Sequence, residues 1–321
     1  MEAENRLSQT IVLGSRYRGW ILDGLAHESA KLLNHTPKYI YLKHKRLSLD
    51  FIKRAMIKDV LWENGLVFIN HNTFLEMHFE HQELERLHKV SKVLFTHYIP
   101  DSKGNHIDHL RRLNIVSEVL VFSARDKSWL LETGVTDTKI SVIGGFIDRN
   151  KFHPAKSGHD KEESEYVIIV GDCKERKNPR LIEQVIRQNP NINFLIHGRH
   201  WNTYEVTKLR NVIYIEFDQS HHCDLMRNAS AFLSLSNVEG GPFPTLEALA
   251  SGTPVVVTDT GWNAEYVTQD NGFLIKLPEP IDSISKKLSE AIGMKKAVKH
   301  RDLIQGRAIP ELFANSLLRM G

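Results

Sequence analysis

Two glutamates, Glu239 and Glu247, stand eight positions apart in the stretch NVEGGPFPTLEALASGTPVVV, separated by glycines and prolines. Pro244 suits the first position of a helix over Thr245–Ala250, because its missing N–H would have no partner there. Gly252 suits a left-handed stop at the end of that helix. The helix N-terminus, with free N–H groups and the positive end of the dipole, is predicted to attract a phosphate.

The predicted helix limits what the two carboxylates can do. Glu247, expected in the first turn, would repel a phosphate, but a carboxylate there can accept hydrogen bonds from two adjacent hydroxyls, such as a ribose 2′,3′-diol. Glu239, before the helix, would then lie near the group that the phosphates carry. Diol, diphosphate and sugar in a row describe a nucleotide sugar. The alternative is that Glu247 only complements the helix dipole and Glu239 is a solvated loop residue.

A wider stretch, EGGPFPTLEALASGTPVVVTDTGWNAEYV, resembles the donor-site signature of retaining GT-B glycosyltransferases with a Glu-x7-Glu motif, the family 4-like "glycosyl transferases group 1". The glutamate spacing matches, and NGFLI matches the usual ending of the segment. Upstream, NIVSEVLVFSARDKSWLLETGVTDTKISVIGGFIDRNKFHP resembles the end of the family's first domain. The resemblance covers most of residues 90–280. The A-x-G-x-P-V-V run of the family is present as Ala250, Gly252, Pro254, Val255 and Val256.

This resemblance implies a GT-B fold, with two Rossmann-like doubly wound domains facing across a cleft. It implies retaining transfer of a sugar from a nucleotide-diphosphate sugar, such as a UDP- or GDP-sugar, without any further cofactor. Glu247 would bind the donor ribose and Glu239 a hydroxyl of the donor sugar. The backbone that would surround the phosphates belongs to Gly240, Gly241, Phe243, Pro244 and Thr245.

The family also places an Arg and a Lys after the first strand of the second domain, where they neutralise the diphosphate. Lys177 falls on the lysine, but Asp172, directly after Gly171, occupies the arginine position. Without a second cation, stabilisation of the leaving group would be impaired, and a catalytically silent binding or partner subunit becomes an alternative. The residues that could supply this second charge are Lys174, Arg176 and Arg199.

The first domain carries weaker signals. His97, in FTHYIPD, ends a predicted strand where the family often has a histidine near the reacting centre, and His71 is the alternative. Gly14 follows the first predicted strand, where a backbone turn could approach the phosphates. Its surroundings, GSRYRG, match neither a Walker loop nor G-x-G-x-x-G.

Paired histidines raise the question of a metal. A spacing of three on a helix can pair ligands, but no closed tetrahedral set is apparent and the chain has no Asp-x-Asp. Because Lys177 and a helix terminus would neutralise the diphosphate, the sequence predicts a metal-independent enzyme. The pairs are His78 with His81, His106 with His109, and His221 with His222.

Composition limits the partners. The net charge of +3 over 321 residues argues against bulk nucleic-acid binding. A basic cluster is either a solvated helix face or a site for an anionic acceptor or surface, such as a phospholipid headgroup, a lipid-linked saccharide or a polynucleotide. It comprises Lys43–Arg46, Lys53, Arg54 and Lys58.

The two cysteines, Cys173 and Cys223, are too few for a disulfide framework and are expected to be reduced thiols. The N-terminus lacks the regions of a signal peptide, and no apolar run approaches the ~20 residues of a membrane span. We therefore expect a cytoplasmic protein, or one attached at most to the inner membrane surface.

Short apolar runs alternate with helical patterns, which is typical of parallel sheets. We expect an acceptor-side domain over 1–150, a linker over 151–165, a donor domain over 166–280, and a helical tail over 281–321 that packs back on the first domain. Another enzyme on this fold, a sugar-nucleotide epimerase or a phosphorylase, remains an alternative. Strands are predicted at 10–13, 39–42, 66–70, 92–96, 118–122, 140–143, 166–170, 193–196, 212–215, 231–235 and 254–258.

Overall fold

The protein is described from a computed structural model, which divides into two compact units, Met1–Gly144 with Ile309–Gly321 and Gly145–Ala308. The structure describes the backbone of four early strands and then residues 112–155 except 117, 146 and 149. It resumes at Tyr166 and continues to Met294. The four early strands are β1 (Ile11–Ser15), β2 (Lys38–Tyr41), β3 (Leu66–Asn70) and β4 (Ser91–Phe95).

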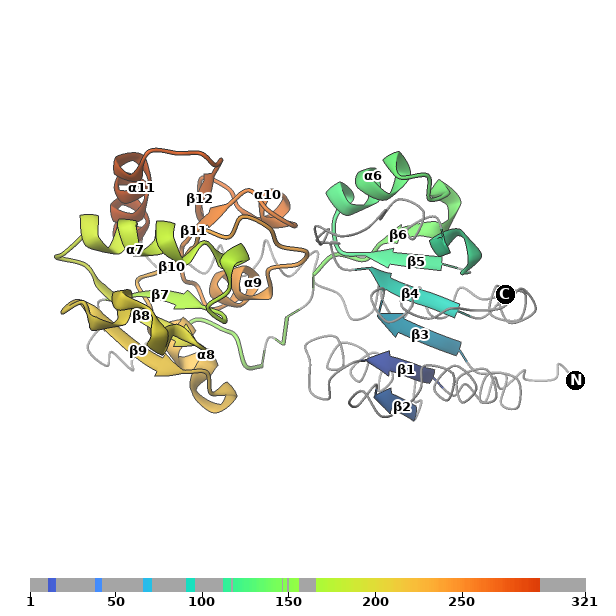
Figure 1. The fold of residues 1–321 in the computed structure, drawn as a ribbon, viewed down its shortest axis with the longest axis horizontal. Helices are drawn as coiled ribbons and strands as arrows, with labels where there is room; N and C mark the ends of the chain where they lie inside the picture. The colour runs from blue at the N-terminus through green and yellow to red at the C-terminus, as the bar shows by residue number, and fades with distance from the viewer. Residues whose placement is uncertain are drawn as a thin grey trace, which may run out of the picture. The chain divides into compact units, whose positions relative to one another are not determined.

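The first unit contains a six-stranded parallel sheet in the order β2-β1-β3-β4-β5-β6 (Figure 1). The order begins 2-1-3-4-5, as in flavodoxin-like folds, so the direction of winding reverses between β1 and β3. Between β5 (Glu118–Val121) and β6 (Ile140–Val142) lies helix α6 (Ala124–Glu132), whose N-cap Ser123 accepts a hydrogen bond from the Asp126 N–H.

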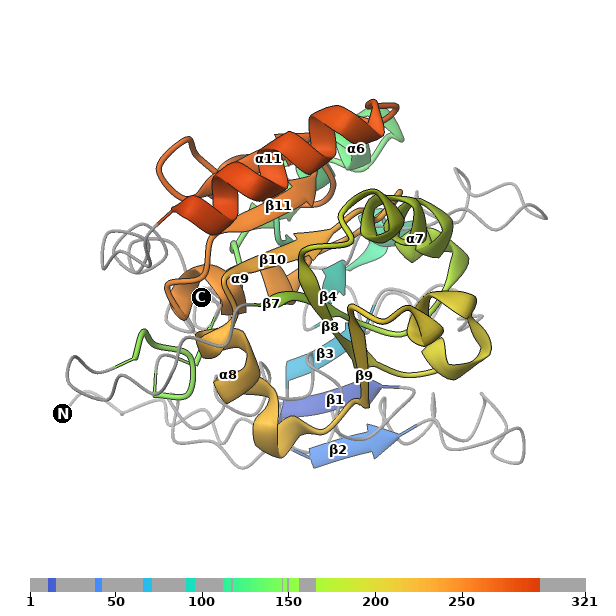
Figure 2. The ribbon, with the colours of Figure 1, turned by 90° about the vertical axis from the view of Figure 1, so that its left-hand side faces the viewer.

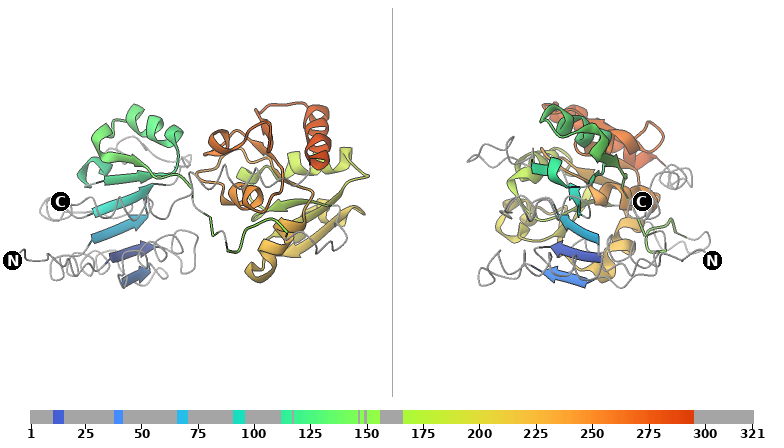
Figure 3. Two further views of the ribbon diagram at one scale, coloured as in Figure 1. Left: turned by 180° about the vertical axis from the view of Figure 1, so that it is seen from behind. Right: turned by 90° about the vertical axis from the view of Figure 1, so that its right-hand side faces the viewer.

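The second unit contains another six-stranded parallel sheet, in the order β12-β11-β10-β7-β8-β9, which can be followed from behind in Figure 3. Numbered within the unit, this is the 3-2-1-4-5-6 order of a dinucleotide-binding fold, and the winding reverses between β7 and β10. The strands are β7 (Tyr166–Val170), β8 (Asn193–Gly198), β9 (Val212–Glu216), β10 (Ala231–Ser234), β11 (Val255–Thr258) and β12 (Gly272–Ile275).

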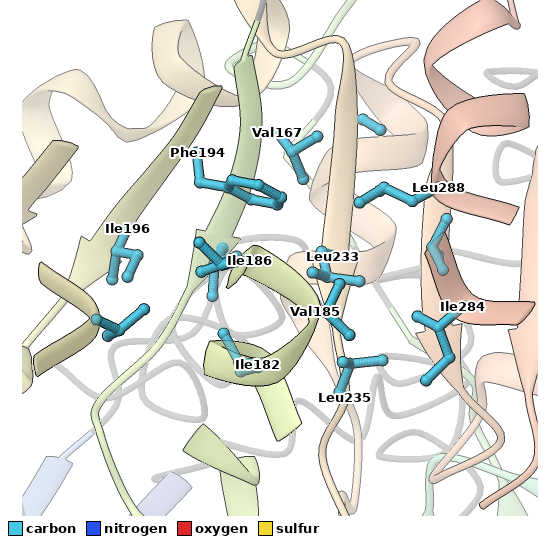
Figure 4. Packing of buried hydrophobic residues seen from close by; sticks show 14 of the residues in the cluster. Val167, Ile182, Val185, Ile186, Phe194, Ile196, Leu233, Leu235, Ile284 and Leu288 are labelled. Atoms are coloured by element: carbon cyan, nitrogen blue, oxygen red, sulfur yellow. The ribbon is translucent and has the colours of Figure 1, made fainter. Parts of the chain in front are cut away.

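Helices cover this second sheet. α7 (Pro179–Gln188) and α11 (Ile281–Gly293) contact each other, and α11 also contacts β10, β11 and β12 (Figure 2). α9 (Phe243–Ala250) contacts β10, β11 and α8 (Gln219–Asn228). The core beneath α7 and α11 includes Val167, Ile182, Val185, Ile186, Phe194, Ile196, Leu233, Leu235, Ile284 and Leu288 (Figure 4).

The remaining elements of the second unit are short. They comprise α10 (Asn263–Tyr266) and the 3-10 turns η3 (Glu175–Lys177), η4 (Trp201–Thr203) and η5 (Glu205–Lys208). In the first unit η1 (Arg112–Ile115) and η2 (Asp137–Lys139) are of the same kind. None of the helices that the structure describes is long and apolar enough to cross a membrane.

The eleven strands expected from the sequence are confirmed within two residues at their ends, and those at 66–70 and 166–170 without any shift. The sequence missed β12, a short strand that begins at Gly272. Gly14 was expected after the first strand, but it lies inside β1, in register with Ile40 and Ile69, because the strand continues to Ser15.

The expected tail begins with α11, which packs on the second sheet through Ile284, Leu288 and Ala291. The part of the tail beyond Met294 lies outside the described residues, so its predicted packing on the first domain stays a prediction. The linker and domain limits that the sequence gives at 150, 165 and 280 stay predictions.

Candidate functional site

The side chains singled out in the second unit gather where its winding reverses. β7 leads into residues 171–178, and β10 leads into residues 235–242 and then into α9. β7 and β10 are neighbours in the sheet, so the carboxyl ends of both strands meet at one edge. Ligands of doubly wound sheets bind at this kind of position.

Glu239 lies between two cations. Its Oε1 is 2.5 Å from Nζ of Lys177, and its Oε2 is 2.7 Å from Nη1 of Arg176. The glutamate is only 7% exposed. Burial acts to raise the pKa of this carboxyl, but Lys177 and then Arg176 outweigh it and hold the pKa below its ordinary value. Glu239 is therefore an ionised, buried carboxylate, so the alternative interpretation as a solvated loop residue is wrong.

The segment that carries the two cations is tied to the loop that carries Glu239. The Asn237 N–H donates to the Arg176 carbonyl at 2.8 Å, and the Asn178 side-chain amide donates to Oδ1 of Asn237 at 3.1 Å. Asn178 has a φ of 55°, a left-handed conformation that asparagine adopts more readily than most residues. This residue ends η3 and precedes α7, so the turn there sets the direction of Lys177.

Gly171 allows Lys177 to lie against the end of β7. Its φ is +127°, and a Cβ added there would be 3.2 Å from Cε of Lys177. The Gly171 carbonyl accepts a hydrogen bond from Nε1 of the buried Trp201 at 2.7 Å. The glycine thus holds no ligand through a side chain, but it leaves space for the lysine stem.

The structure separates the three candidates for the second cation. Arg176 joins Lys177 at Glu239. Lys174 and Arg199 lie beside Asp172 instead, with Nζ 3.5 Å and Nε 3.9 Å from its carboxylate oxygens, and Arg199 also lies over the ring of Phe217 at 5.6 Å. The negative charge of Asp172 is therefore shared with two exposed cations, away from the pair on Glu239.

The start of α9 differs from the expectation of several free N–H groups. The helix begins at Phe243, so Pro244 is its second residue, and the N–H groups of Phe243 and Thr245 donate to the carbonyls of Gly241 and Pro242. The hydroxyl of Thr245 is fully buried and has no hydrogen-bond partner within the described part of the chain. This hydroxyl remains a donor for a ligand at the helix start.

Gly241 supports the same turn from the other side. A Cβ on Gly241 would lie 2.6 Å from the Trp262 ring, which itself packs edge-on against Phe243 at 4.9 Å between centroids. Gly261 also passes close to the turn, with a φ of +55° and an added Cβ 2.8 Å from the Gly240 carbonyl oxygen. The backbone at Gly240 and Gly241 is therefore fixed by packing, without flanking side chains.

Glu247 lies in the second turn of α9, because the helix starts two residues before the expected position. The idea that it complements the positive end of the helix dipole loses its basis, because that effect falls off within the first turn. Its side chain is 12% exposed, and Oε2 is 2.9 Å from Nε2 of His222. His222 in turn lies 3.2 Å from His197, between their Nδ1 atoms.

Sequence reasoning missed His197 and His222 as partners of Glu247. The doublet His221–His222 was considered only as a weak metal pair, whereas the two side chains differ in surroundings: His221 is 74% exposed and His222 3%. Among the described residues, no group of three or more His, Cys, Asp or Glu side chains is placed to hold a metal ion. Cys173 and Cys223 are both free thiols.

Several residues predicted from the sequence lie outside the described part of the chain. These are His97, its alternative His71, the histidine pairs at 78–81 and 106–109, and the basic cluster of residues 43–58. Their predicted roles stay predictions.

Residues 150–305 match the family model of glycosyl transferases group 1. This match lies within the second unit and covers just under half of the chain. In fold, the chain is similar to the GT-B glycosyltransferases among the solved structures, and no curated protein sequence matches it significantly.

Three solved structures illustrate this likeness in fold. A glycosyltransferase from Rickettsia africae is 17% identical, with a TM-score of 0.74 and 97% of each chain covered. Anabaena HepE in complex with UDP-glucose is 14% identical, with a TM-score of 0.72, 97% of this chain and 98% of HepE covered. TarM is 17% identical, with a TM-score of 0.64 over 85% of this chain, and the match spans only 57% of TarM.

Proposed function

We propose that the protein transfers a sugar from a nucleoside diphosphate sugar to an acceptor with retention of configuration and without a metal ion. The observation that carries the proposal is the pair Arg176 and Lys177, held on the buried Glu239 beside the start of α9. Cations and glycine backbone at one edge of the sheet suit a diphosphate, and so does the buried Thr245 hydroxyl, which has no partner among the described residues. HepE, which shares the fold, has been solved with UDP and with UDP-glucose.

Charge at the site favours an anionic leaving group. Two cations and one ionised glutamate leave one net positive charge in the cluster, which a diphosphate would more than neutralise. In the transition state, negative charge grows on the phosphate oxygen as the bond to the sugar breaks, and a fixed cation there stabilises it. Arg176 and Lys177 supply this charge, and Asp172 does not prevent it because other cations pair with it.

The proposed step balances without a general base from the described residues. The C1–O bond to the diphosphate breaks on the same face on which the acceptor oxygen attacks. The acceptor proton passes to the departing phosphate oxygen, and the products are the glycoside and the nucleoside diphosphate. Glu239 would accept a hydrogen bond from a donor-sugar hydroxyl, and Glu247 would accept bonds from the ribose.

The acceptor is proposed only by class. The predicted basic cluster of residues 43–58 suits an anionic acceptor, either lipid-linked or at an inner membrane surface. A polynucleotide is disfavoured by the small net charge of +3. A cytoplasmic location is proposed because Cys173 and Cys223 are free thiols, as in a reducing compartment.

The decisive experiment incubates the protein with UDP-, GDP- and ADP-sugars, with EDTA present and with a panel of glycan and lipid acceptors. Release of nucleoside diphosphate that depends on an acceptor, together with a product that keeps the donor's anomeric configuration by NMR, is the expected result. Activity that requires manganese, or an inverted product, would contradict the mechanism. An isomerised donor with no nucleotide release would indicate an epimerase. A phosphorylase would release a sugar phosphate, and binding without turnover would indicate a silent subunit.

A further inference from the structure

Three side chains from three elements form a buried chain of hydrogen bonds that ends on Glu247. The Asp218 N–H donates to Nε2 of His197, at the end of β8, at 3.0 Å. Nδ1 of His197 lies 3.2 Å from Nδ1 of His222 on α8, and Nε2 of His222 lies 2.9 Å from Oε2 of Glu247 on α9. None of these contacts involves the cations that hold Glu239.

The groups at the two ends of this chain of hydrogen bonds determine which nitrogen of each histidine carries the proton. A backbone N–H can only donate, so Nε2 of His197 carries a lone pair and its Nδ1 carries the proton. That proton is donated to Nδ1 of His222, and so the His222 proton is on Nε2, which donates to the Glu247 carboxylate. With two neutral imidazoles and one ionised carboxylate, every donor in the chain faces an acceptor. If His222 instead carried its proton on Nδ1, that N–H would face the N–H on Nδ1 of His197, and two donors would meet.

Packing keeps both rings in place. His197 is fully buried and stacks on Phe217, with 4.8 Å between ring centroids and an interplanar angle of 21°. His222 is almost fully buried, and its ring meets the ring of Phe152 edge-on, with 5.7 Å between the ring centroids. Burial, and then the neighbouring His222, lower the pKa of His197 to about 4, which keeps the ring neutral near pH 7.

We propose that His222 and His197 are positioning residues that hold the Glu247 carboxylate in the orientation needed to bind the two ribose hydroxyls of the nucleotide. This inference rests on the proposed function. A glutamate has three rotatable bonds, and fixing Oε2 by a buried donor before the ligand arrives removes part of the entropy cost of binding. Oε1 and the second lone pair of Oε2 then remain for the diol.

The positioning role of His222 predicts how its variants should discriminate between nucleotides with and without the ribose hydroxyls. If His222 acts through Glu247, its removal should weaken only the interaction with the ribose hydroxyls. Affinity for a nucleotide without the 2′- and 3′-hydroxyls should be unchanged. A general structural defect would weaken both nucleotides equally, so the ratio of the two affinities separates positioning from folding.

The experiment measures binding of UDP, GDP and ADP and of the matching 2′,3′-dideoxynucleotides by calorimetry. Wild type is expected to prefer the ribose form by about tenfold or more, the equivalent of a hydrogen bond to a charged group. In Glu247→Ala this preference should vanish. In His222→Phe most of it should vanish, with the dideoxynucleotide affinity within about twofold of wild type.

Two further variants complete the series. His222→Gln places an amide N–H close to the position of Nε2 and should restore much of the preference. His221→Phe changes the neighbouring histidine, which is 74% exposed, and should leave the preference intact. His197→Asn keeps a donor at the position of Nδ1 and should cost less preference than His197→Leu.

The outcomes separate the two proposals. If wild type and His222→Phe prefer the ribose form equally while Glu247→Ala does not, the positioning role is wrong and the proposed function stands. If His222→Phe loses both affinities to the same extent, the histidine is only structural. If wild type binds none of the diphosphates, or binds ribose and dideoxyribose forms alike, the ribose role of Glu247 fails and the positioning role fails with it.

Discussion

Glu239 and Glu247 are eight residues apart and both nearly buried, yet their surroundings differ in kind. Glu239 lies between a guanidinium and an ammonium group on a segment that follows β7, whereas Glu247 is hydrogen-bonded to the imidazole of His222 on α8. The cations around Glu239 balance its negative charge, whereas the hydrogen bond with His222 fixes the orientation of the Glu247 carboxylate. The contrast matches the two tasks of a donor site: to stabilise a charge that changes during reaction, and to hold a group that does not change.

The largest expected effect comes from removing the charge balance around Glu239. Replacing both cations, Arg176→Met with Lys177→Met, leaves a buried carboxylate with no ionic partner. We expect a loss of about 3–5 kcal/mol in the free energy of unfolding at pH 7, measured by urea denaturation. Adding Glu239→Gln to the double variant should recover most of the loss, because the remaining group is uncharged. Equal stability of the double and triple variants would contradict the account.

The two environments should also lose stability in different pH ranges. The unfolded His197 takes up a proton near its ordinary pKa of 6.5, but the folded residue only near 4. Its contribution to stability is therefore complete above about 6.5 and is lost as the pH falls to about 4, at a total of up to about 3 kcal/mol. Besides burial and His222, which lower this pKa, His221 lowers it and Asp218 raises it.

Glu239 affects the stability of the protein in a lower pH range than His197 does. Its folded pKa is below the ordinary 4.5, so its contribution is present above about 4.5 and is lost as the pH falls further. Thermal unfolding from pH 3 to 8 tests both ranges. His197→Asn should flatten the upper range and Glu239→Gln the lower one, whereas His221→Asn should narrow the upper range only slightly, because His221 is the smallest cause of the lowered His197 pKa. An unchanged upper range in His197→Asn would mean that another group titrates there.

Much of this arrangement could be predicted from the sequence. Strands such as 66–70 and 166–170 are short apolar runs bounded by polar residues, so the local pattern determines them. The spacing of Glu239 and Glu247 lies within one contiguous sequence motif, so it can be read directly from the sequence. The left-handed residue at Gly252, with a φ of 75°, follows from the need to end α9 before Pro254.

The remainder depends on contacts between distant segments. The sequence offered three cations for one role, and the choice of Arg176 results from η3 and the left-handed Asn178, which no periodic pattern reveals. His222 and Glu247 are 25 residues apart, and His197 is another 25 before His222. They meet only because β8, α8 and α9 converge at one edge of the sheet. Helix starts are also poorly determined, so Glu247 was assigned to the wrong turn.

A kinetic comparison distinguishes the substrate-orienting role proposed for Glu247 from the charge-stabilising role proposed for Lys177. Glu247→Ala removes hydrogen bonds to a ribose that is bound throughout, so we expect a higher KM for the donor with little change in kcat. Lys177→Ala removes a cation from charge that grows as the bond breaks, so we expect mainly a lower kcat. Each effect should be about 10- to 150-fold, as for a hydrogen bond to a charged group. Interchanged effects on KM and kcat would reverse the assignment of the two regions.

The smallest expected effect concerns Asp172, which occupies the position of the usual arginine. Its contacts with Lys174 and Arg199, at 3.5 and 3.9 Å, involve cations that are 57% and 55% exposed. Such exposed pairs contribute little, so Asp172→Asn should change the free energy of unfolding by less than about 1 kcal/mol. It should also leave kcat within about threefold, because the cation next to Glu239 is already supplied elsewhere.

Arginine variants sharpen this prediction by comparing residues of the same type. Arg176→Gln removes the cation that lies 2.7 Å from Glu239 and should lower kcat for transfer, whereas Arg199→Gln removes a cation beside Asp172 and should not. If Asp172→Asn raises activity strongly, or if Arg199→Gln impairs transfer as much as Arg176→Gln, then the second charge comes from the Asp172 neighbourhood. In that case the cations at Glu239 would be structural, and the charge that meets the leaving group would have to be sought at the ends of β7 and β8.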